Sequence, residues 1–302
     1  MLSEQKYEWD NIFAKGTCTA PISIYSGNTE IHTQNTEIAH TIFTNINFTG
    51  NAEGTDVALM GTSSGIEVEE SDPQTYYWIN GAGDWDDENH WSLSSGGSPA
   101  GCIPSGKDHV IFDNQSFQNN DDVFRIPQNA YVHDFRWNIS VSGPTVALEN
   151  SANLFINGSM VMAGEKATFD NQGSIHFVAG EEAILDTKDS EIDGNIIFNG
   201  NGPWQMESDF TSLLNIHLNA GTLQLNGNRL RNNNFYSEKE RKRTMDISGS
   251  HWIFVDPPTY SNSFPIIVLN QFTLLSEGSH TFFKKNNSLS VRGGNTSTIL
   301  SL

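Results

Sequence analysis

The chain has 302 residues, of which 36% are hydrophobic, 11% aromatic and 17% charged. This composition is too apolar and too aromatic for a disordered acidic tail, so we expect a folded core. Sixteen Lys and Arg against 36 Asp and Glu give a formal charge of −20, which repels phosphate backbones and anionic lipid. No run reaches the roughly 18 apolar residues of a membrane-spanning helix. We therefore expect neither a nucleic-acid partner nor membrane insertion.

The first part of the chain contains a short internal echo. Asn28–Thr33 reads Asn-Thr-Glu-Ile-His-Thr, and Asn35–Thr41 answers it with Asn-Thr-Glu-Ile-Ala-His-Thr. We interpret residues 1–73 as the end of a preceding β segment. The acidic run that ends at Pro73 marks the predicted boundary, and residues 74–302 form the second predicted module.

Two cysteines, Cys18 and Cys102, each follow a glycine within two residues and precede a proline within three. These similar turn contexts suggest equivalent positions, and a disulfide between them is one interpretation. Two inert thiols are the other. Two cysteines are too few for a zinc site of their own, and the nine histidines show none of the short spacings of a transition-metal site. We therefore predict no cofactor, apart from the calcium considered next.

Residues 76–92 hold the most distinctive motif, in which three tryptophans are separated by 7 and 6 residues around tight glycine turns. The tryptophans would either stack on sugar rings or cap an exposed end of a β column. The carboxylates between them would either contact calcium or remain solvated in a turn. An EF-hand loop is excluded because Asn89 and Ser95 stand where Gly and the bidentate Glu are required. The candidate glycan and calcium contacts are Trp78, Trp85, Trp91, Asp84, Asp86 and Asp87.

A further acidic group follows at Asn119–Asp122, with Arg125 close behind. Acidic clusters on β-helices serve as acids and bases in some polysaccharide-degrading enzymes. Paired carboxylates are also common in turns, so we name no catalytic residue. Asp121 and Asp122 are the positions that the enzymatic alternative would use.

Short apolar alternations bounded by Gly, Asn and Asp predict strands and an all-β chain. Their starts recur at intervals of 22, 22, 21, 21 and 20 residues, and a second series continues with intervals of 21 and 21. A period near 20 is typical of one coil of a parallel β-solenoid, in which stacked coils bury a continuous apolar column. We therefore predict a parallel β-helix with coils of about 20 to 22 residues; β-sandwich modules are the alternative. The first series is Val110, Val132, Leu154, Ile175, Ile196 and Ile216, and the second is Ile247, Val268 and Leu289.

The motif of residues 76–92, followed by Cys102-Ile103-Pro104 and Asp108–Asp113, resembles the opening of β-helical modules in large surface adhesins of the Bacteroidota. The resemblance continues through Leu223–Leu230, Arg243–Ile247 and Ser250–Trp252. Such proteins are exported by type IX secretion and include gliding-motility adhesins, so the resemblance implies a cell-surface location. It brings no functional residues with it. The first residues lack the pattern of a signal peptide, which suggests an internal segment of a larger protein.

The sequence thus favours a non-enzymatic, extracellular module that acts as a stalk or contacts glycans or a surface. Its expected partners are neighbouring modules of the same protein and polysaccharide. The alternative is a polysaccharide lyase or hydrolase on the same scaffold. A flat ice- or mineral-binding ladder is disfavoured, because the aligned positions are apolar rather than Thr or Asn.

Overall fold

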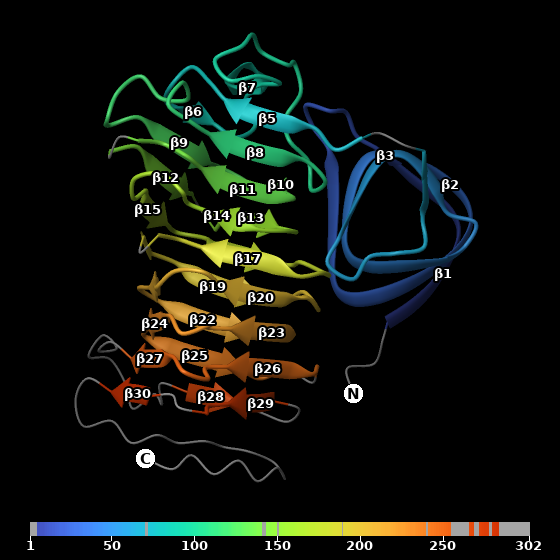
Figure 1. Ribbon diagram of the computed structural model, residues 1–302. Coiled ribbons are helices and arrows are strands. Elements are labelled where there is room, and N and C mark those ends of the chain that lie inside the picture. Colours follow the sequence, from blue (N-terminus) through green and yellow to red (C-terminus); the bar gives the residue numbers. More distant parts are fainter. Residues whose placement is uncertain are drawn as a thin grey trace.

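A computed structural model describes residues 5–69, 72–140, 143–149, 151–188, 190–239, 241–254, 266–268, 272–277 and 280–283. The protein is an all-β parallel solenoid, which confirms the predicted fold class (Figure 1). In the described ranges the only helical element is the 3-10 turn η1 (Glu88–His90). No helix in these ranges is long and apolar enough to cross a membrane.

The solenoid has three sides, and most coils contribute one strand to each side. The ten-stranded sheet consists of β5 (Thr75–Trp78), β7 (Trp91–Ser92), β8 (His109–Phe112), β11 (Asp134–Trp137), β14 (Met160–Val161), β17 (Ala183–Asp186), β20 (Pro203–Met206), β23 (Gly221–Gln224), β26 (Arg243–Asp246) and β29 (Phe272–Leu275). All its neighbouring strands pair in parallel except β5 and β7.

The second sheet has seven strands: β10 (Ala130–Val132), β13 (Asn153–Ile156), β16 (Ser174–Phe177), β19 (Asn195–Phe198), β22 (Asn215–Leu218), β25 (Asn234–Ser237) and β28 (Ile266–Val268). The third side is split into two sheets. Its upper part contains β6 (Gly83–Asp84), β9 (Val123–Ile126), β12 (Thr145–Leu148) and β15 (Thr168–Asn171). Its lower part contains β18 (Glu191–Ile192), β21 (Phe210–Ser212), β24 (Arg229–Asn232), β27 (His251–Phe254) and β30 (His280–Phe283).

The predicted repeat is correct through the middle of the solenoid. Leu154, Ile175, Ile196 and Ile216 are successive register partners in the seven-stranded sheet. All four side chains are fully buried. One inward apolar residue per coil therefore builds the continuous core column, as a stacked parallel sheet requires.

The phase of the repeat was wrong at its ends. Val132 pairs with Ile156 rather than with Leu154. Val110 lies in the ten-stranded sheet, opposite Phe135. The turns between the sheets vary in length. Two residues separated by the same interval can therefore lie on different sides of the solenoid.

The second predicted series fails for the same reason. Val268 is in β28 of the seven-stranded sheet, whereas Ile247 follows β26 of the ten-stranded sheet. The third predicted start, Leu289, lies outside the described residues.

The N-terminal residues 5–69 form a second, smaller winding, which we call the N-terminal coil (Figure 1). It contains β1 (Gln5–Lys15), β2 (Ile22–Gly50), β3 (Glu53–Met60) and β4 (Glu67–Glu69), paired in parallel in that order. The register pairs Gln5 with Thr29, Ile38 with Gly54, and Glu53 with Glu67. Successive windings therefore take 24, 16 and 14 residues.

Positive backbone φ angles bend the strands of the coil. Within β2, His40 has φ 44° and Asn45 has φ 58°; on the next winding Asp56 has φ 55° and Gly61 has φ 66°. The register places Asp56 beside His40 and Gly61 beside Asn45, so left-handed residues stack at two corners. The coil has an apolar core of its own, which includes Ile31, Ile38, Phe43, Phe48 and Val57.

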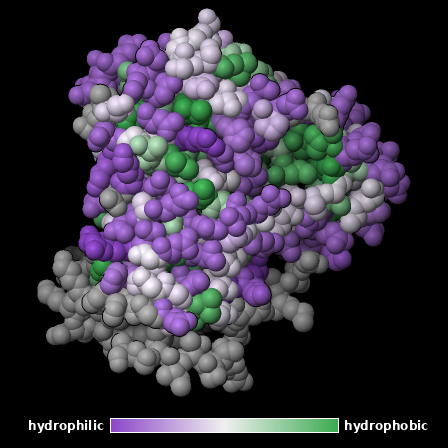
Figure 2. Space-filling view, viewed as in Figure 1, coloured by the Kyte–Doolittle hydropathy of each residue, from purple (hydrophilic) through white to green (hydrophobic). Residues whose placement is uncertain are grey.

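The coil and the solenoid share a third apolar cluster, made of Ile42, Ala58 and Met60 from the coil and Tyr131, Phe155 and Val178 from the solenoid. The Asn157 side chain fixes this contact by accepting from the Gly61 amide at 2.9 Å. Lys107 of the solenoid forms an ion pair with Asp56 of the coil. Figure 2 shows a mainly hydrophilic surface over the solenoid and a larger apolar area over the coil.

Candidate functional site

The three tryptophans of the motif form a cap on the first coil of the solenoid. Trp78 and Trp91 are fully buried, and Trp85 is 3% exposed. Their rings pack edge to face, with centroids 5.0 Å apart for Trp78 and Trp91 and 5.0 Å for Trp85 and Trp91. An open sugar-stacking platform is therefore the wrong interpretation, because Trp78 and Trp91 have no face open to a ligand.

The buried indole N–H groups of the motif each donate to a nearby backbone carbonyl, one of them in the turn at Asn80 and Gly81. Trp78 Nε1 donates to the Gly81 carbonyl at 2.7 Å, and Trp91 Nε1 donates to the Trp85 carbonyl at 2.8 Å. Asn80 and Gly81 both have positive φ, which turns the chain back over the core. We call residues 75–92 the tryptophan cap.

Asp84, Asp86 and Asp87 of the cap each have their own protein partner. Asp84 Oδ1 accepts from Arg125 Nε at 2.6 Å, and Asp86 Oδ2 accepts from Gln128 Nε2 at 2.8 Å. Asp87 caps η1 by accepting from the Asn89 amide at 3.0 Å. That amide and the Asn89 side chain lower the pKa of the Asp87 carboxyl. The structure does not gather these three carboxylates into one calcium ligand set, so the predicted calcium contact is not assembled in the described residues.

The acidic group after β8 is likewise a turn. Burial alone would raise the pKa of the Asp122 carboxyl, but hydrogen bonds from Asn119 and Gln118 lower it. The two backbone amides donate to Asp122 Oδ2 at 2.9 and 2.8 Å. Asp121 is exposed, and Arg125 is already paired with Asp84. Asp122 therefore stabilises the turn by accepting hydrogen bonds from its backbone amides.

Cys18 and Cys102 form a disulfide, with their Cα atoms 5.0 Å apart. Cys18 lies between β1 and β2 of the coil, and Cys102 lies between β7 and β8 of the solenoid. Of the two interpretations left open by the sequence, the structure selects the pair. The Ile103 amide also donates to the Cys18 carbonyl at 3.0 Å, so the two loops are joined by a hydrogen bond as well.

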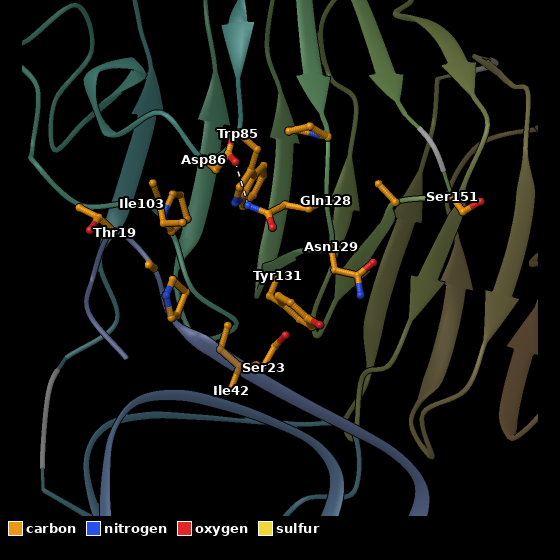
Figure 3. Close-up of a pocket in the computed structure, with 15 residues that line it drawn as sticks. Thr19, Ser23, Ile42, Trp85, Asp86, Ile103, Gln128, Asn129, Tyr131 and Ser151 are labelled. Carbon is orange, nitrogen blue, oxygen red and sulfur yellow. Dashed lines mark hydrogen bonds between the residues drawn. The ribbon is translucent and has the colours of Figure 1, made fainter. Parts of the chain in front are cut away.

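A cleft of about 720 Å³ lies beside this junction, between the coil and the solenoid (Figure 3). Its walls present amides and hydroxyls, one carboxylate and the edges of buried rings. In Figure 3 the linked side chains of Asp86 and Gln128 face this space from the solenoid, opposite Ser23 and Ile42 of the coil. We call it the interface cleft. The polar side chains along it are Thr19, Ser23, Asp86, Gln128, Asn129 and Ser151.

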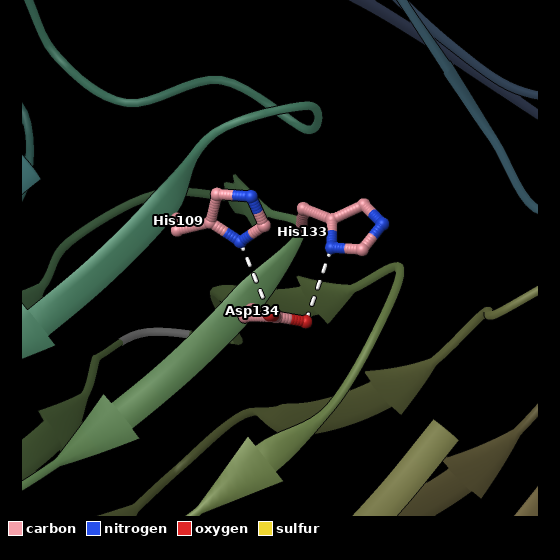
Figure 4. A group of neighbouring side chains, drawn as sticks. All are labelled: His109, His133 and Asp134. Atoms are coloured by element: carbon pink, nitrogen blue, oxygen red, sulfur yellow. Dashed lines mark hydrogen bonds and ion pairs between the residues drawn. The ribbon is translucent and has the colours of Figure 1, made fainter. Parts of the chain in front are cut away.

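A second group of side chains, which could bind a metal ion, was not predicted from the sequence. His109 begins β8, and His133 and Asp134 stand at the start of β11. His109 Nδ1 lies 3.1 Å from Asp134 Oδ2, and His133 Nδ1 lies 3.1 Å from Asp134 Oδ1. Figure 4 shows both imidazoles turned toward the one carboxylate. We call these three residues the His/Asp cluster.

Asp134 is the centre of this cluster. Ser159 donates its backbone N–H to Oδ1 at 2.8 Å, and Arg136 Nη2 donates to Oδ2 at 3.2 Å. Burial by itself would raise the pKa of the Asp134 carboxyl. The hydrogen bonds from His133, Ser159 and Arg136 outweigh burial and hold that pKa well below its usual range. Asp134 is therefore a carboxylate across the physiological pH range.

The repeat length of the solenoid is the sequence signal that could have identified this cluster. His109 and Asp134 are 25 residues apart and are register partners on adjacent strands. The short sequence spacings typical of metal ligands on helices or in zinc-binding turns do not include a pair 25 residues apart. In a solenoid, residues one coil apart are the neighbours that matter.

The comparisons with known proteins do not assign a function. No protein-family model matches the chain, and no curated protein or solved structure matches it.

Proposed function

We propose that this chain is a non-enzymatic, extracellular structural module of a large cell-surface protein, acting as a stiff stalk that also contacts surface glycans. The observation that carries the proposal is the parallel ladder that runs from β5 to β29 of the ten-stranded sheet. It is closed at one end by the tryptophan cap and joined to a second winding by a disulfide.

The ladder supports a mechanical role. Each coil hydrogen-bonds along its strands to the coils above and below, and the inward side chains fill one continuous column. Such a stack transmits load through many backbone hydrogen bonds at once and resists bending. The cap adds three buried tryptophans where the first coil would otherwise expose its core.

The Cys18–Cys102 disulfide supports an extracellular location. Disulfides form and persist in oxidising compartments and are rare where thiols are kept reduced. This bond links two units that each have an apolar core, so its loss would leave them joined by the shared apolar cluster, the polar contacts around it and the connecting chain.

The acidic residues support a structural rather than a catalytic role. Asp84, Asp87 and Asp122 are held by an arginine or by backbone amides in turns. The net charge of −20 keeps a long module soluble and discourages self-association.

The interface cleft is where we place glycan contact. Amide and hydroxyl groups such as those of Gln128, Asn129 and Ser151 are the donors and acceptors that bind sugar hydroxyls. A cleft between two rigid units is also pre-formed, which reduces the entropy lost on binding.

The test is incubation of the purified chain with a panel of neutral and acidic polysaccharides, followed by size analysis of the polysaccharide and of the protein. We expect chain lengths to be unchanged and at least one polysaccharide to co-elute with the protein. Gln128→Ala should weaken this co-elution, whereas Gln115→Ala, an exposed glutamine outside the cleft, should not. Shortened polysaccharide would overturn the proposal and favour the lyase or hydrolase alternative.

A further inference from the structure

The His/Asp cluster plays no part in the stalk or in the interface cleft. From its geometry we propose that His109, His133 and Asp134 bind one divalent transition-metal ion of the Zn²⁺ class. The ion would link neighbouring coils of the ten-stranded sheet.

The spacing of the donor atoms fits a single ion. One nitrogen from each imidazole and one oxygen from Asp134 lie within 4.8 Å of one another. The two Nδ1-to-carboxylate distances are 3.1 Å each. Bonds of about 2.0 to 2.2 Å to one ion place neighbouring ligand atoms about 3 Å apart. Small side-chain rotations would bring all three onto one ion.

The chemistry of the donors selects the class of metal. Two imidazoles with one carboxylate suit zinc and related first-row ions, whereas calcium and magnesium prefer an all-oxygen set. Asp134 is ionised and is held in place by the Ser159 amide. The ligand least able to move is therefore the one that carries the negative charge.

The backbone leaves room for the cluster. A Cβ atom at Gly158 would lie 2.4 Å from Asp134 Oδ1 and 2.6 Å from the His133 ring. The side chains of His109 and His133 are 33% and 41% exposed. A bound ion would therefore have an open side for water or for a donor from another molecule.

The positive charge of Arg136 competes with a metal ion for the Asp134 carboxylate. Its guanidinium lies 3.2 Å from Asp134 Oδ2 and carries the positive charge that a metal would otherwise supply. The Arg136 side chain is 50% exposed, so it can move into solvent when the ion enters. The consequence is specific: removing this charge should tighten metal binding, since the competing cation is gone.

The experiment uses the full chain, freed of metal by chelator and dialysis. Calorimetric titration with ZnCl₂ should give one ion per chain, and Co²⁺ should produce the visible absorption of a nitrogen- and oxygen-ligated site. His109→Asn and His133→Asn should each weaken Zn²⁺ binding at least about tenfold. Arg136→Gln should strengthen it. Circular dichroism establishes that each variant is folded.

His32→Gln, at an exposed histidine of the N-terminal coil, is the matched control and should bind Zn²⁺ as the parent chain does. Two results would overturn the proposal. One is a folded parent chain that takes up no Zn²⁺, and the other is undiminished binding in both His109→Asn and His133→Asn. Neither outcome bears on the polysaccharide experiment, because the interface cleft does not include the His/Asp cluster.

Discussion

Cys18 and Cys102 are 84 residues apart in the chain and are joined by a disulfide that ties the N-terminal coil to the loop after the tryptophan cap. The coil and the solenoid otherwise meet through one small apolar cluster and a few polar contacts. The bond therefore restrains two units that bury separate cores.

Replacing both cysteines, in Cys18→Ser with Cys102→Ser, should lower the free energy of unfolding by about 3 to 5 kcal/mol, because a closed loop of this length strongly restricts the unfolded chain. Urea unfolding of the parent and the double variant measures the difference. The parent chain under reducing conditions should behave like the double variant. Identical unfolding midpoints in all three samples would show that the bond does not stabilise the fold.

Trp91→Ala should destabilise the protein by about 3 to 5 kcal/mol, because a large, fully buried side chain is replaced by a cavity. The indole also donates to the Trp85 carbonyl, which would lose its partner. Leu93→Ala is the control, since Leu93 is 54% exposed and should change stability by at most about 0.5 kcal/mol. Thermal melts compare them; equal melting temperatures for the two variants would contradict a capping role.

His176 should make stability depend on pH. Burial, with a smaller contribution from His217, lowers the pKa of His176 to about 4. An unfolded histidine takes up its proton near pH 6.5. Between about pH 6.5 and 4 the unfolded state therefore binds more protons, and the free energy of unfolding falls as the pH drops. The loss should reach about 3 kcal/mol at pH 4.

The pH effect is measured by urea unfolding at a series of pH values for the parent chain and for His176→Leu. The variant should lose less stability across this window, because its side chain does not titrate. His32→Gln should keep the parent's pH dependence, since His32 is exposed. If His176→Leu and the parent show the same slope, His176 is not the responsible group.

Gly173→Ala should cost about 1 to 3 kcal/mol or more, because a Cβ atom there would lie only 1.6 Å from the Ala152 carbonyl oxygen of the preceding coil. Gly27→Ala supplies the contrast, since a Cβ at Gly27 meets nothing within 4 Å. Both variants are compared by thermal melts. A stable Gly173→Ala would mean that neighbouring coils can separate locally without loss of packing.

The middle of the solenoid could be predicted because its signal is local and repeated. Leu154, Ile175 and Ile196 each place one apolar side chain inward at nearly constant intervals. The predicted strand starts at Val110 and Val132 did not align with those in the middle, because the lengths of the turns change there. Both parts of the seven-residue echo, Asn28–Thr33 and Asn35–Thr41, lie within the single strand β2.

The site residues were harder to predict, because their contacts join distant parts of the chain. Sequence alone could not choose between a platform and a cap for Trp78 and Trp91, since only packing against Phe112 and Phe124 decides their exposure. His109 and Asp134 carried no local motif. Their proximity follows from strand register, which is fixed by the three-dimensional winding of the coils.

The windings of the N-terminal coil shorten from 24 to 16 to 14 residues. A winding that narrows in this way is conical, and a cone has a polarity that a uniform rod lacks. At its wide end the coil presents β1 as the edge strand of its sheet, where Tyr7, Trp9 and Phe13 are exposed. The narrow end leads through β4 toward the first strand of the solenoid. Within the coil, the wide end therefore offers an edge strand of 11 residues and the narrow end one of three.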